Sequence, residues 1–370
     1  MNKKQYTELS FEHAKSHFVE EVILLVTATD LETSNLHEQI TPISGQDTIL
    51  KVFEGDLTYY FGVLGMYKVV HVQCGTMGSI GRASSIKTVT SAVEKLKSKV
   101  VIMVGIAFGV DSIKQNIGDV LVSESIIPYN SKRVGKGSTI ERGIECPASK
   151  KLISRFKSIK QTWEYLLVGD KRADLIFTRL LSGEELIDNI HHRNKLIADH
   201  TDSKGGEMEG AGIYAACDQE ADWILIKGIC DFADGDKGSN KKERQNIAMK
   251  SSISACLELF NSTTAFSVFD IETEQKCEDA NQIEVQTIKS VLFDLYDKSK
   301  EPFYIKRDED QEFQTKIKHS GVWIYGPPGV GKTNLILRNL IQVKNTPITI
   351  SCASLVGLDS LEFFKEILYS

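Results

Sequence analysis

The sequence predicts an α/β fold with a largely parallel or mixed sheet, followed by a shorter second α/β segment. From about residue 20 to residue 260, short apolar runs alternate with helical patterns, which is typical of α/β layers. Several of these runs are continuously apolar, as strands covered on both faces are. Beyond residue 285, a strand pattern and a helix pattern flank a glycine-rich motif. The chain is therefore expected to hold more than one domain.

The individual elements follow from the same patterns. Apolar runs predict five strands in the first domain, at 21–28, 67–73, 100–105, 119–125 and 223–229. Helical spacing predicts three helices, at 84–96, 208–217 and 244–259. We expect four regions along the chain: an N-terminal extension (1–19), the α/β domain (20–265), an acidic linker (266–285) and the N-terminal part of a second domain (286–370).

The second domain carries a phosphate-binding motif. Residues 326–333, Gly-Pro-Pro-Gly-Val-Gly-Lys-Thr, match G-x-x-x-x-G-K-[ST], in which backbone N–H groups wrap a phosphate. The predicted nucleotide-binding residues are Gly326, Gly329, Gly331, Lys332 and Thr333, the last through a magnesium ion. Only 37 residues follow the motif, and the next strand pattern (347–351) supplies no carboxylate for the metal. The motif thus predicts an incomplete P-loop NTPase domain, which would bind ATP and Mg²⁺ when complete.

Composition excludes several classes of protein. A net charge of −6 disfavours nucleic-acid binding, which requires basic faces. Seven cysteines are scattered without a C-x-x-C pair, which indicates reduced thiols instead of a disulfide framework or a zinc site. The N-terminus has no apolar signal segment, and no run approaches 18 apolar residues. We therefore expect a cytoplasmic protein with no membrane partner.

Acidic residues follow the predicted strands of the first domain. Glu32 comes just after the first strand, Glu207 and Glu209 precede a helix, and Asp231 follows the last strand. In open α/β sheets, ligands bind outside the carboxyl ends of the strands. Acids at these places also cap helices in the ordinary way, so each residue taken singly has a structural alternative. Together they predict a site.

Seven segments occur in a fixed order that resembles a known family. They are ILLVTATDLE (23–32), GSIGR (78–82), VGIAFG (104–109), IGDVLVS (117–123), SGE (182–184), GEMEGA (206–211) and ICDFAD (229–234). In this order and spacing, residues 20–262 resemble the nucleoside phosphorylase/nucleosidase superfamily, particularly its methylthioadenosine/S-adenosylhomocysteine nucleosidase branch. The resemblance implies a mixed sheet flanked by helices, and a nucleosidase that needs no cofactor.

The resemblance also implies roles for the acidic residues. Asp231 would protonate N7 of the departing purine, Glu209 would bind the ribose hydroxyls, and Glu32 would orient the attacking water. Met208 would pack against the sugar, and Glu207 would either support this network or cap the helix. Glycosidic cleavage passes through an oxocarbenium-like state, so it requires an acid at the leaving group and a base at the water. The other residues expected in the substrate pocket are Gly78, Gly105, Leu186 and Ile187.

Departures from the family pattern bear on the reaction and the substrate. Met103 stands where phosphorolytic members carry a phosphate-binding arginine, so hydrolysis is favoured over phosphorolysis. Leu186, Lys227 and Cys230 replace an aromatic residue, an arginine and a serine, which leaves the purine substrate open. The basic stretch 131–142 would be either a clamp for a triphosphate or a solvated loop.

The order of the two domains resembles that of bacterial antiphage-defence proteins and of fungal immune-receptor-like proteins. The resemblance implies an N-glycosidic hydrolase acting on an adenine nucleoside or nucleotide. ATP is one candidate, with adenine and ribose-5′-triphosphate as products. It also implies homo-oligomers, control by the NTPase module and a phage-derived trigger acting through a further C-terminal sensor. Two alternatives stay open: a metabolic purine nucleoside phosphorylase or thioadenosine nucleosidase, and a non-catalytic nucleotide-sensing oligomerisation scaffold.

Overall fold

The computed structural model describes residues 4–18, 22–81, 83–134, 139–141, 143–218, 220–236, 238, 240–274, 308–316, 335, 336 and 338. The chain divides into two compact units, Met1–Glu278 and Asp279–Ser370. In the second unit, helix α9 spans Asp308–Lys316, and Arg338 pairs with Asp310 at 3.3 Å. The phosphate loop 326–333 and the strand patterns on either side of it lie outside the described residues.

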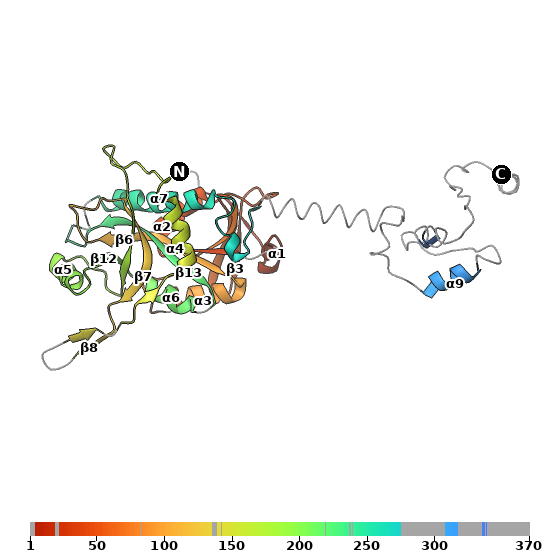
Figure 1. Ribbon diagram of the computed structural model, residues 1–370, viewed down its shortest axis with the longest axis horizontal. Helices are drawn as coiled ribbons and strands as arrows, with labels where there is room; N and C mark the ends of the chain where they lie inside the picture. Colours follow the sequence, from red (N-terminus) through yellow and green to blue (C-terminus); the bar gives the residue numbers. More distant parts are fainter. Residues whose placement is uncertain are drawn as a thin grey trace. The chain divides into compact units, whose positions relative to one another are not determined.

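The first unit consists of an 11-stranded mixed sheet, a separate two-stranded sheet (β8 and β9) and the helices that cover the large sheet (Figure 1). Its strands are β1 (Tyr6–Glu8), β2 (Ile23–Thr27), β3 (Ile49–Glu54), β4 (Leu57–Leu64), β5 (Tyr67–Gln73), β6 (Val100–Gly109), β7 (Val120–Pro128), β8 (Lys132–Val134), β9 (Thr139–Glu141), β10 (Cys146–Pro147), β11 (Leu175–Ser182), β12 (Ser203–Glu207) and β13 (Asp222–Asp231). Its helices are α1 (Phe11–Lys15), α2 (Asp30–Gln39), α3 (Ser85–Leu96), α4 (Lys150–Ile159), α5 (Ile190–Asp199), α6 (Gly210–Cys217), α7 (Lys241–Phe260) and the 3₁₀ turn η1 (Ser267–Phe269).

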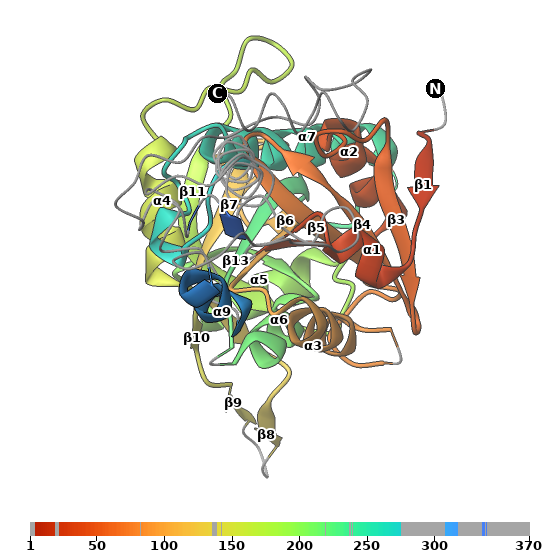
Figure 2. The ribbon, with the colours of Figure 1, turned by 90° about the vertical axis from the view of Figure 1, so that its right-hand side faces the viewer.

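All five strands and all three helices predicted for this unit are present, which confirms the mixed α/β sheet. The central strands β2, β5 and β6 are parallel and almost wholly buried. Helices α2 and α7 lie on one side of the sheet, and α3 and α6 lie on the other, as two perpendicular views show (Figure 1, Figure 2). Coverage on both faces explains why these strands have continuously apolar sequences.

Part of the sheet closes on itself. Strand β13 pairs parallel with β6 and antiparallel with β7, and β7 pairs parallel with β11. Strand β11 continues parallel to β12, which returns antiparallel to β6. The five strands therefore form a small closed barrel beside the open part of the sheet. Closure removes the free edges that an open sheet would present, and it brings distant strand ends together.

The folded unit extends beyond the limits expected for the α/β domain on both sides. Strand β1 adds to the sheet as a parallel partner of β3, and Phe11 and Ala14 of α1 are buried in the core. At the other end, Phe266 and Phe269 are buried against the same core. Residues from the predicted N-terminal extension and from the start of the predicted linker are thus part of this unit.

A chain of hydrogen bonds between aromatic and hydroxyl groups runs through the open part of the sheet. The Tyr6 hydroxyl lies 2.8 Å from His37 Nδ1, and His37 Nε2 lies 2.9 Å from Nδ1 of His71. His71 Nε2 lies 2.9 Å from Oγ1 of Thr27, the last residue of β2. Burial, reinforced by the charge of Lys4, lowers the pKa of His37 from 6.5 to about 4. Burial also lowers the pKa of His71 well below 6.5, so both imidazoles are neutral at physiological pH.

The protein should lose stability as the pH falls from about 6.5 to about 4. In that range the unfolded chain binds a proton at His37 and the folded chain does not, so acid favours unfolding. The depressed pKa corresponds to about 3 kcal/mol of stability that is present above pH 6.5 and absent near pH 4. Urea unfolding of wild type and His37→Gln at several pH values measures this. The difference between their unfolding free energies should shrink on acidification, whereas the exposed control His191→Gln should follow wild type throughout. Parallel curves for wild type and His37→Gln would contradict the assignment.

Among the described residues, no helix is long and apolar enough to cross a membrane.

Candidate active site

All four predicted carboxylates line one pocket of the first unit. Glu32, Glu207, Glu209 and Asp231 come from three different parts of the sheet and meet there. The register of the barrel explains the convergence: Gly206 of β12 lies opposite Phe108 of β6, and Asp231 of β13 also pairs with that residue. The end of β2 leads into the same place, because β2 also pairs with β6. Residues some 200 positions apart thus form a single site.

Glu32 lies in the first turn of α2, directly after β2. Its Oε2 accepts hydrogen bonds from the backbone N–H groups of Ala28 and Thr29, at 2.7 and 2.8 Å. Its Oε1 accepts from the N–H of Ile106 in β6, at 2.9 Å. The bond from Thr29 is one half of an N-terminal capping box, whereas the bond from Ile106 ties the carboxylate to a different strand. The Glu32 side chain therefore both caps α2 and lies in the pocket.

Burial raises the pKa of Glu32 above its ordinary value, and the attraction of Lys227 opposes this only in part. A carboxylate with a raised pKa is a better base near neutral pH. The close approach of Glu32 to β6 requires a glycine at position 105, because a Cβ there would lie 2.5 Å from Glu32 Oε1. Gly105 thus acts on the pocket through Glu32 and does not line it.

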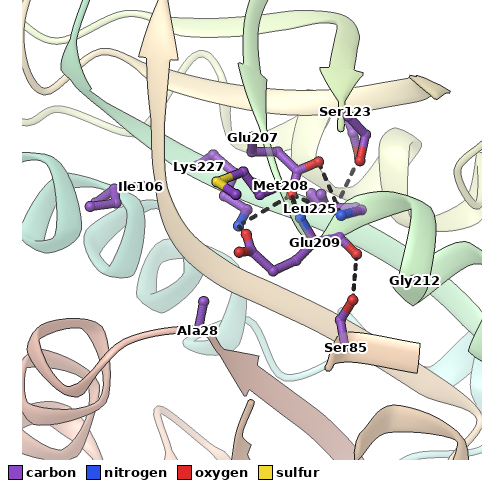
Figure 3. A network of polar contacts seen from close by, with 12 residues as sticks. Ala28, Ser85, Ile106, Ser123, Glu207, Met208, Glu209, Gly212, Leu225 and Lys227 are labelled. Atoms are coloured by element: carbon purple, nitrogen blue, oxygen red, sulfur yellow. Dashed lines mark hydrogen bonds and ion pairs between the residues drawn. The ribbon is translucent and has the colours of Figure 1, made fainter. Parts of the chain in front are cut away.

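Lys227 is a fully buried ammonium group among carboxylates (Figure 3). Its Nζ lies 3.3 Å from Glu209 Oε2 and 3.6 Å from Glu207 Oε2. Burial alone would lower its pKa, but the charges of Glu209, Glu207 and Glu32 outweigh burial and raise it. Lys227 is therefore charged, and it holds two carboxylates of the pocket in place.

Glu207 and Glu209 flank Met208 at the start of α6, but they have different partners. Glu207 accepts hydrogen bonds from the N–H groups of Gly210 (2.8 and 3.0 Å) and Glu209 (2.9 Å), so it caps α6. Burial raises its pKa, with Lys227 opposing the shift. Glu209 accepts one hydrogen bond from the N–H of Gly78, at 3.2 Å, and reaches Lys227 with its other oxygen. Both alternatives for Glu207, capping and support of the network, are therefore present in the geometry.

Asp231 is the last residue of β13 and is only partly buried. The register between β13 and β6 shifts between Ile229 and Asp231, and such irregularities redirect side chains. Oδ1 of Asp231 accepts a hydrogen bond from the N–H of Ala233 at 2.9 Å, and the Cys230 thiol donates to Oδ2 at 3.2 Å. Asp231 thus reaches the pocket in a fixed orientation, as a general acid requires.

The remaining predicted substrate residues divide into two groups. Met208, Leu186 and Ile187 line the pocket, with Ile187 buried and Leu186 63% exposed. Gly78 and Gly105 do not line it but contact Glu209 and Glu32, respectively. All nine residues predicted for the first-domain site are therefore within this pocket or next to it.

Sequence reasoning missed the wall that α7 contributes. Lys241, Arg244 and Gln245 line the pocket, at the i, i+3 and i+4 spacing that places them on one helix face. That spacing was visible in the sequence, but the predicted helix began only at residue 244. The basic stretch 131–142 is the anion-binding candidate of the sequence, and its strands β8 and β9 form a hairpin that projects from the body of the unit (Figure 2).

The described residues contain no group of three or more His, Cys, Asp and Glu side chains that could hold a metal ion. The vicinal pair His191 and His192 lies on α5, where His192 Nε2 contacts Glu185 at 2.7 Å. The pocket offers a partly exposed carboxylate (Asp231), a buried carboxylate with a raised pKa (Glu32), and carboxylates held by the buried ammonium group of Lys227.

Together, the partly closed mixed sheet and the pocket define an α/β domain with a carboxylate-lined pocket. Residues 22–261 match the Phosphorylase superfamily, so the chain belongs to that family. This family membership confirms two predictions: that the chain is an enzyme, and that it has an α/β phosphorylase/nucleosidase-like fold.

Relatives of several kinds share this domain. A protein of the sponge Amphimedon queenslandica called a death domain-containing ATP nucleosidase is 31% identical over 232 residues. The match takes in 58% of this chain and 44% of that protein, so the chain spans less than half of that relative's length. The 5′-methylthioadenosine/S-adenosylhomocysteine nucleosidase of Neisseria meningitidis, in complex with methylthio-immucillin-A, superimposes with a TM-score of 0.55 at 18% identity, covering 65% of this chain and 99% of that one.

Futalosine hydrolase of Helicobacter pylori superimposes with a TM-score of 0.54 at 17% identity, over 65% of this chain and 97% of that one. At such identities the two solved structures support the fold alone.

Proposed function

We propose that this protein hydrolyses the N-glycosidic bond of an adenine nucleotide, with ATP as the leading candidate. The observation that carries the proposal is the convergence of Glu32, Glu209 and Asp231 on one pocket. Cleavage needs an acid at the base and a second carboxylate at the water, and oxocarbenium character at the sugar gains from nearby negative charge. The similarity to a protein called an ATP nucleosidase supports adenine nucleotides as the substrate class.

In this proposal each carboxylate has one task. Asp231 donates a proton to N7 of the adenine, so that the base leaves neutral. Glu209, anchored by Lys227 and Gly78, binds the ribose hydroxyls, while Met208 packs against the sugar. Glu32, whose pKa is raised by burial, orients the water and accepts its proton. Glu207 serves the site through Lys227 and the helix cap.

Hydrolysis is favoured over phosphorolysis by the residue at position 103. Met103 is a fully buried residue of β6 that does not line the pocket. Its thioether cannot bind an anion in the manner of an arginine. Water is therefore the proposed nucleophile.

We further propose that the phosphate-loop segment regulates this activity, in oligomers and in antiviral defence. The observation behind this part is the complete motif at residues 326–333, on the same chain as the nucleosidase domain. A nucleotide bound there would act by its differential affinity for active and inactive assemblies.

Incubation of the purified protein with adenosine, AMP, ADP and ATP, with and without inorganic phosphate, tests the proposal. We expect free adenine and an unphosphorylated anomeric carbon, detected by mass spectrometry, at a rate that phosphate does not change. A 1-phosphorylated sugar would instead identify a phosphorylase, and absence of free base from every substrate would contradict the proposed activity. In the full-length protein, Lys332→Ala should leave the pocket intact but remove activation; equal adenine release in both proteins would contradict the regulatory part.

A further inference from the structure

The first turn and a half of α7 forms a cationic wall of the pocket. Lys241, Arg244 and Gln245 all line it, and α7 is a helix of 20 residues. None of these side chains has a task in the acid–base chemistry derived above. Two cations on the wall of a carboxylate pocket require an explanation, because neither is needed to hold a neutral nucleoside.

The same turn offers unpaired hydrogen-bond donors. Asn240 at the N-cap makes no side-chain capping bond, so the first N–H groups of α7 have no side-chain acceptor from this residue. These N–H groups and the helix dipole favour an anion at this end. Nε of Arg244 is buried and has no hydrogen-bond partner among the described residues. Helix end and side chains therefore attract the same kind of ligand.

The position of this wall fits one end of the proposed substrate. Asp231, Leu186 and Ile187 mark the end of the pocket that would hold the base. The start of α7 lies beside α2, because Asn246 Oδ1 accepts a hydrogen bond from Asn35 Nδ2 at 2.9 Å. Helix α2 carries Glu32, the proposed base for the water. With the base and the reacting carbon assigned to other walls, the wall of α7 remains for the substituent on C5′.

Two acidic residues near this wall, Asp236 and Glu185, already have partners. Arg244 donates to the backbone oxygen of Asp236 and lies 3.7 Å from the Asp236 carboxylate, which is largely exposed. Glu185, also on the pocket, contacts His192. A multiply charged phosphate chain would therefore compete with the exposed Asp236 carboxylate for Arg244. Lys241 has no ion-pair partner in the described part of the chain.

We propose that Lys241 and Arg244 bind the 5′-phosphate groups of the substrate and thereby select nucleotides over nucleosides. This inference rests on the proposed function, and it assigns the specificity to α7 instead of the basic stretch 131–142. Gln245 supplies a neutral donor on the same helix face.

Kinetic comparison of ATP and adenosine tests the assignment. Charge-assisted hydrogen bonds of this kind change binding by about 10- to 100-fold. Lys241→Gln and Arg244→Gln should each lower kcat/KM for ATP by roughly that factor, and change kcat/KM for adenosine by less than about threefold. Lys242→Gln is the matched control, since Lys242 is exposed on the same turn and does not line the pocket. Equal losses on both substrates, or an equal loss in the control, would overturn the proposal.

A binding measurement separates this proposal from the proposed function. Calorimetry measures the binding of inorganic tripolyphosphate and needs no catalysis. The Lys332→Ala variant serves as the background, so that the phosphate loop does not contribute to binding. Binding that Lys241→Gln weakens about tenfold or more, and that Lys242→Gln leaves unchanged, supports the subsite even if no base is released. Binding that is absent, or that is insensitive to Lys241→Gln, overturns the subsite even if adenine release is observed. Thermal melting checks that each variant is folded.

Discussion

Asp231→Asn is expected to lower the rate of adenine release by about 10²- to 10⁴-fold, the range typical of a lost general acid. The amide has the size of the carboxyl group, and its oxygen can still accept the hydrogen bond from the Ala233 N–H. It cannot pass a proton to N7, so the purine would have to leave as an anion. Single-turnover assays with ATP, followed by chromatography of free adenine, measure the effect.

Asp234→Asn is the matched control for this variant. Asp234 is exposed three residues further along the chain and does not line the pocket. We expect its adenine release to match wild type. Adenine release at the wild-type rate by Asp231→Asn would remove Asp231 from the mechanism, and with it the proposed assignment of the leaving-group end of the pocket.

Lys227→Met is expected to destabilise the protein by about 3–5 kcal/mol, since it leaves buried carboxylates without their counter-ion. Methionine fills a similar volume, so the loss arises from charge and not from a cavity. The pKa values of Glu207 and Glu32, already raised by burial, would rise further, because the charge of Lys227 makes the largest contribution that lowers them. Denaturant unfolding at neutral pH measures the loss of stability.

The double variant Lys227→Met with Glu207→Gln distinguishes charge from packing. Removing one of the unpaired carboxylates should restore part of the lost stability, although Glu207→Gln alone weakens the cap of α6. A coupling free energy of at least about 1 kcal/mol is expected for groups in direct contact. Strictly additive losses, or a Lys227→Met variant as stable as wild type, would mean that the ammonium group does not organise the cluster.

The sequence predicted those strands whose own residues are mostly apolar. The runs at β2, β6 and β13 are mainly apolar, because helices cover both faces of these strands. Strands β11 and β12 were not predicted. Strand β12 (Ser203–Glu207) is short and holds two glycines, and β11 mixes polar with apolar residues, so neither shows a clear period. Their pairing partners, not their own sequences, make them strands.

The candidate site shows the same division. Glu32, Glu209 and Asp231 could be named from their places after strands and from the family resemblance. Their mutual contacts could not, because neither the apolar strand that holds Lys227 nor the family resemblance shows which carboxylates its ammonium group meets. The pairing register of β6 and β13 places residue 227 opposite residue 105. This register determines how Glu32, Glu209 and the Lys227 ammonium group meet.

The sequence by itself determined the α/β class, the acidic residues at the strand ends and the phosphate-loop motif, because each depends on local pattern and spacing. Only the tertiary structure decided that five strands close into a barrel, that Lys227 is buried among carboxylates, and that α7 brings Lys241 and Arg244 to the pocket. The physical reason is that pairing register and burial are properties of contacts between residues far apart in the chain, and local periodicity does not encode them.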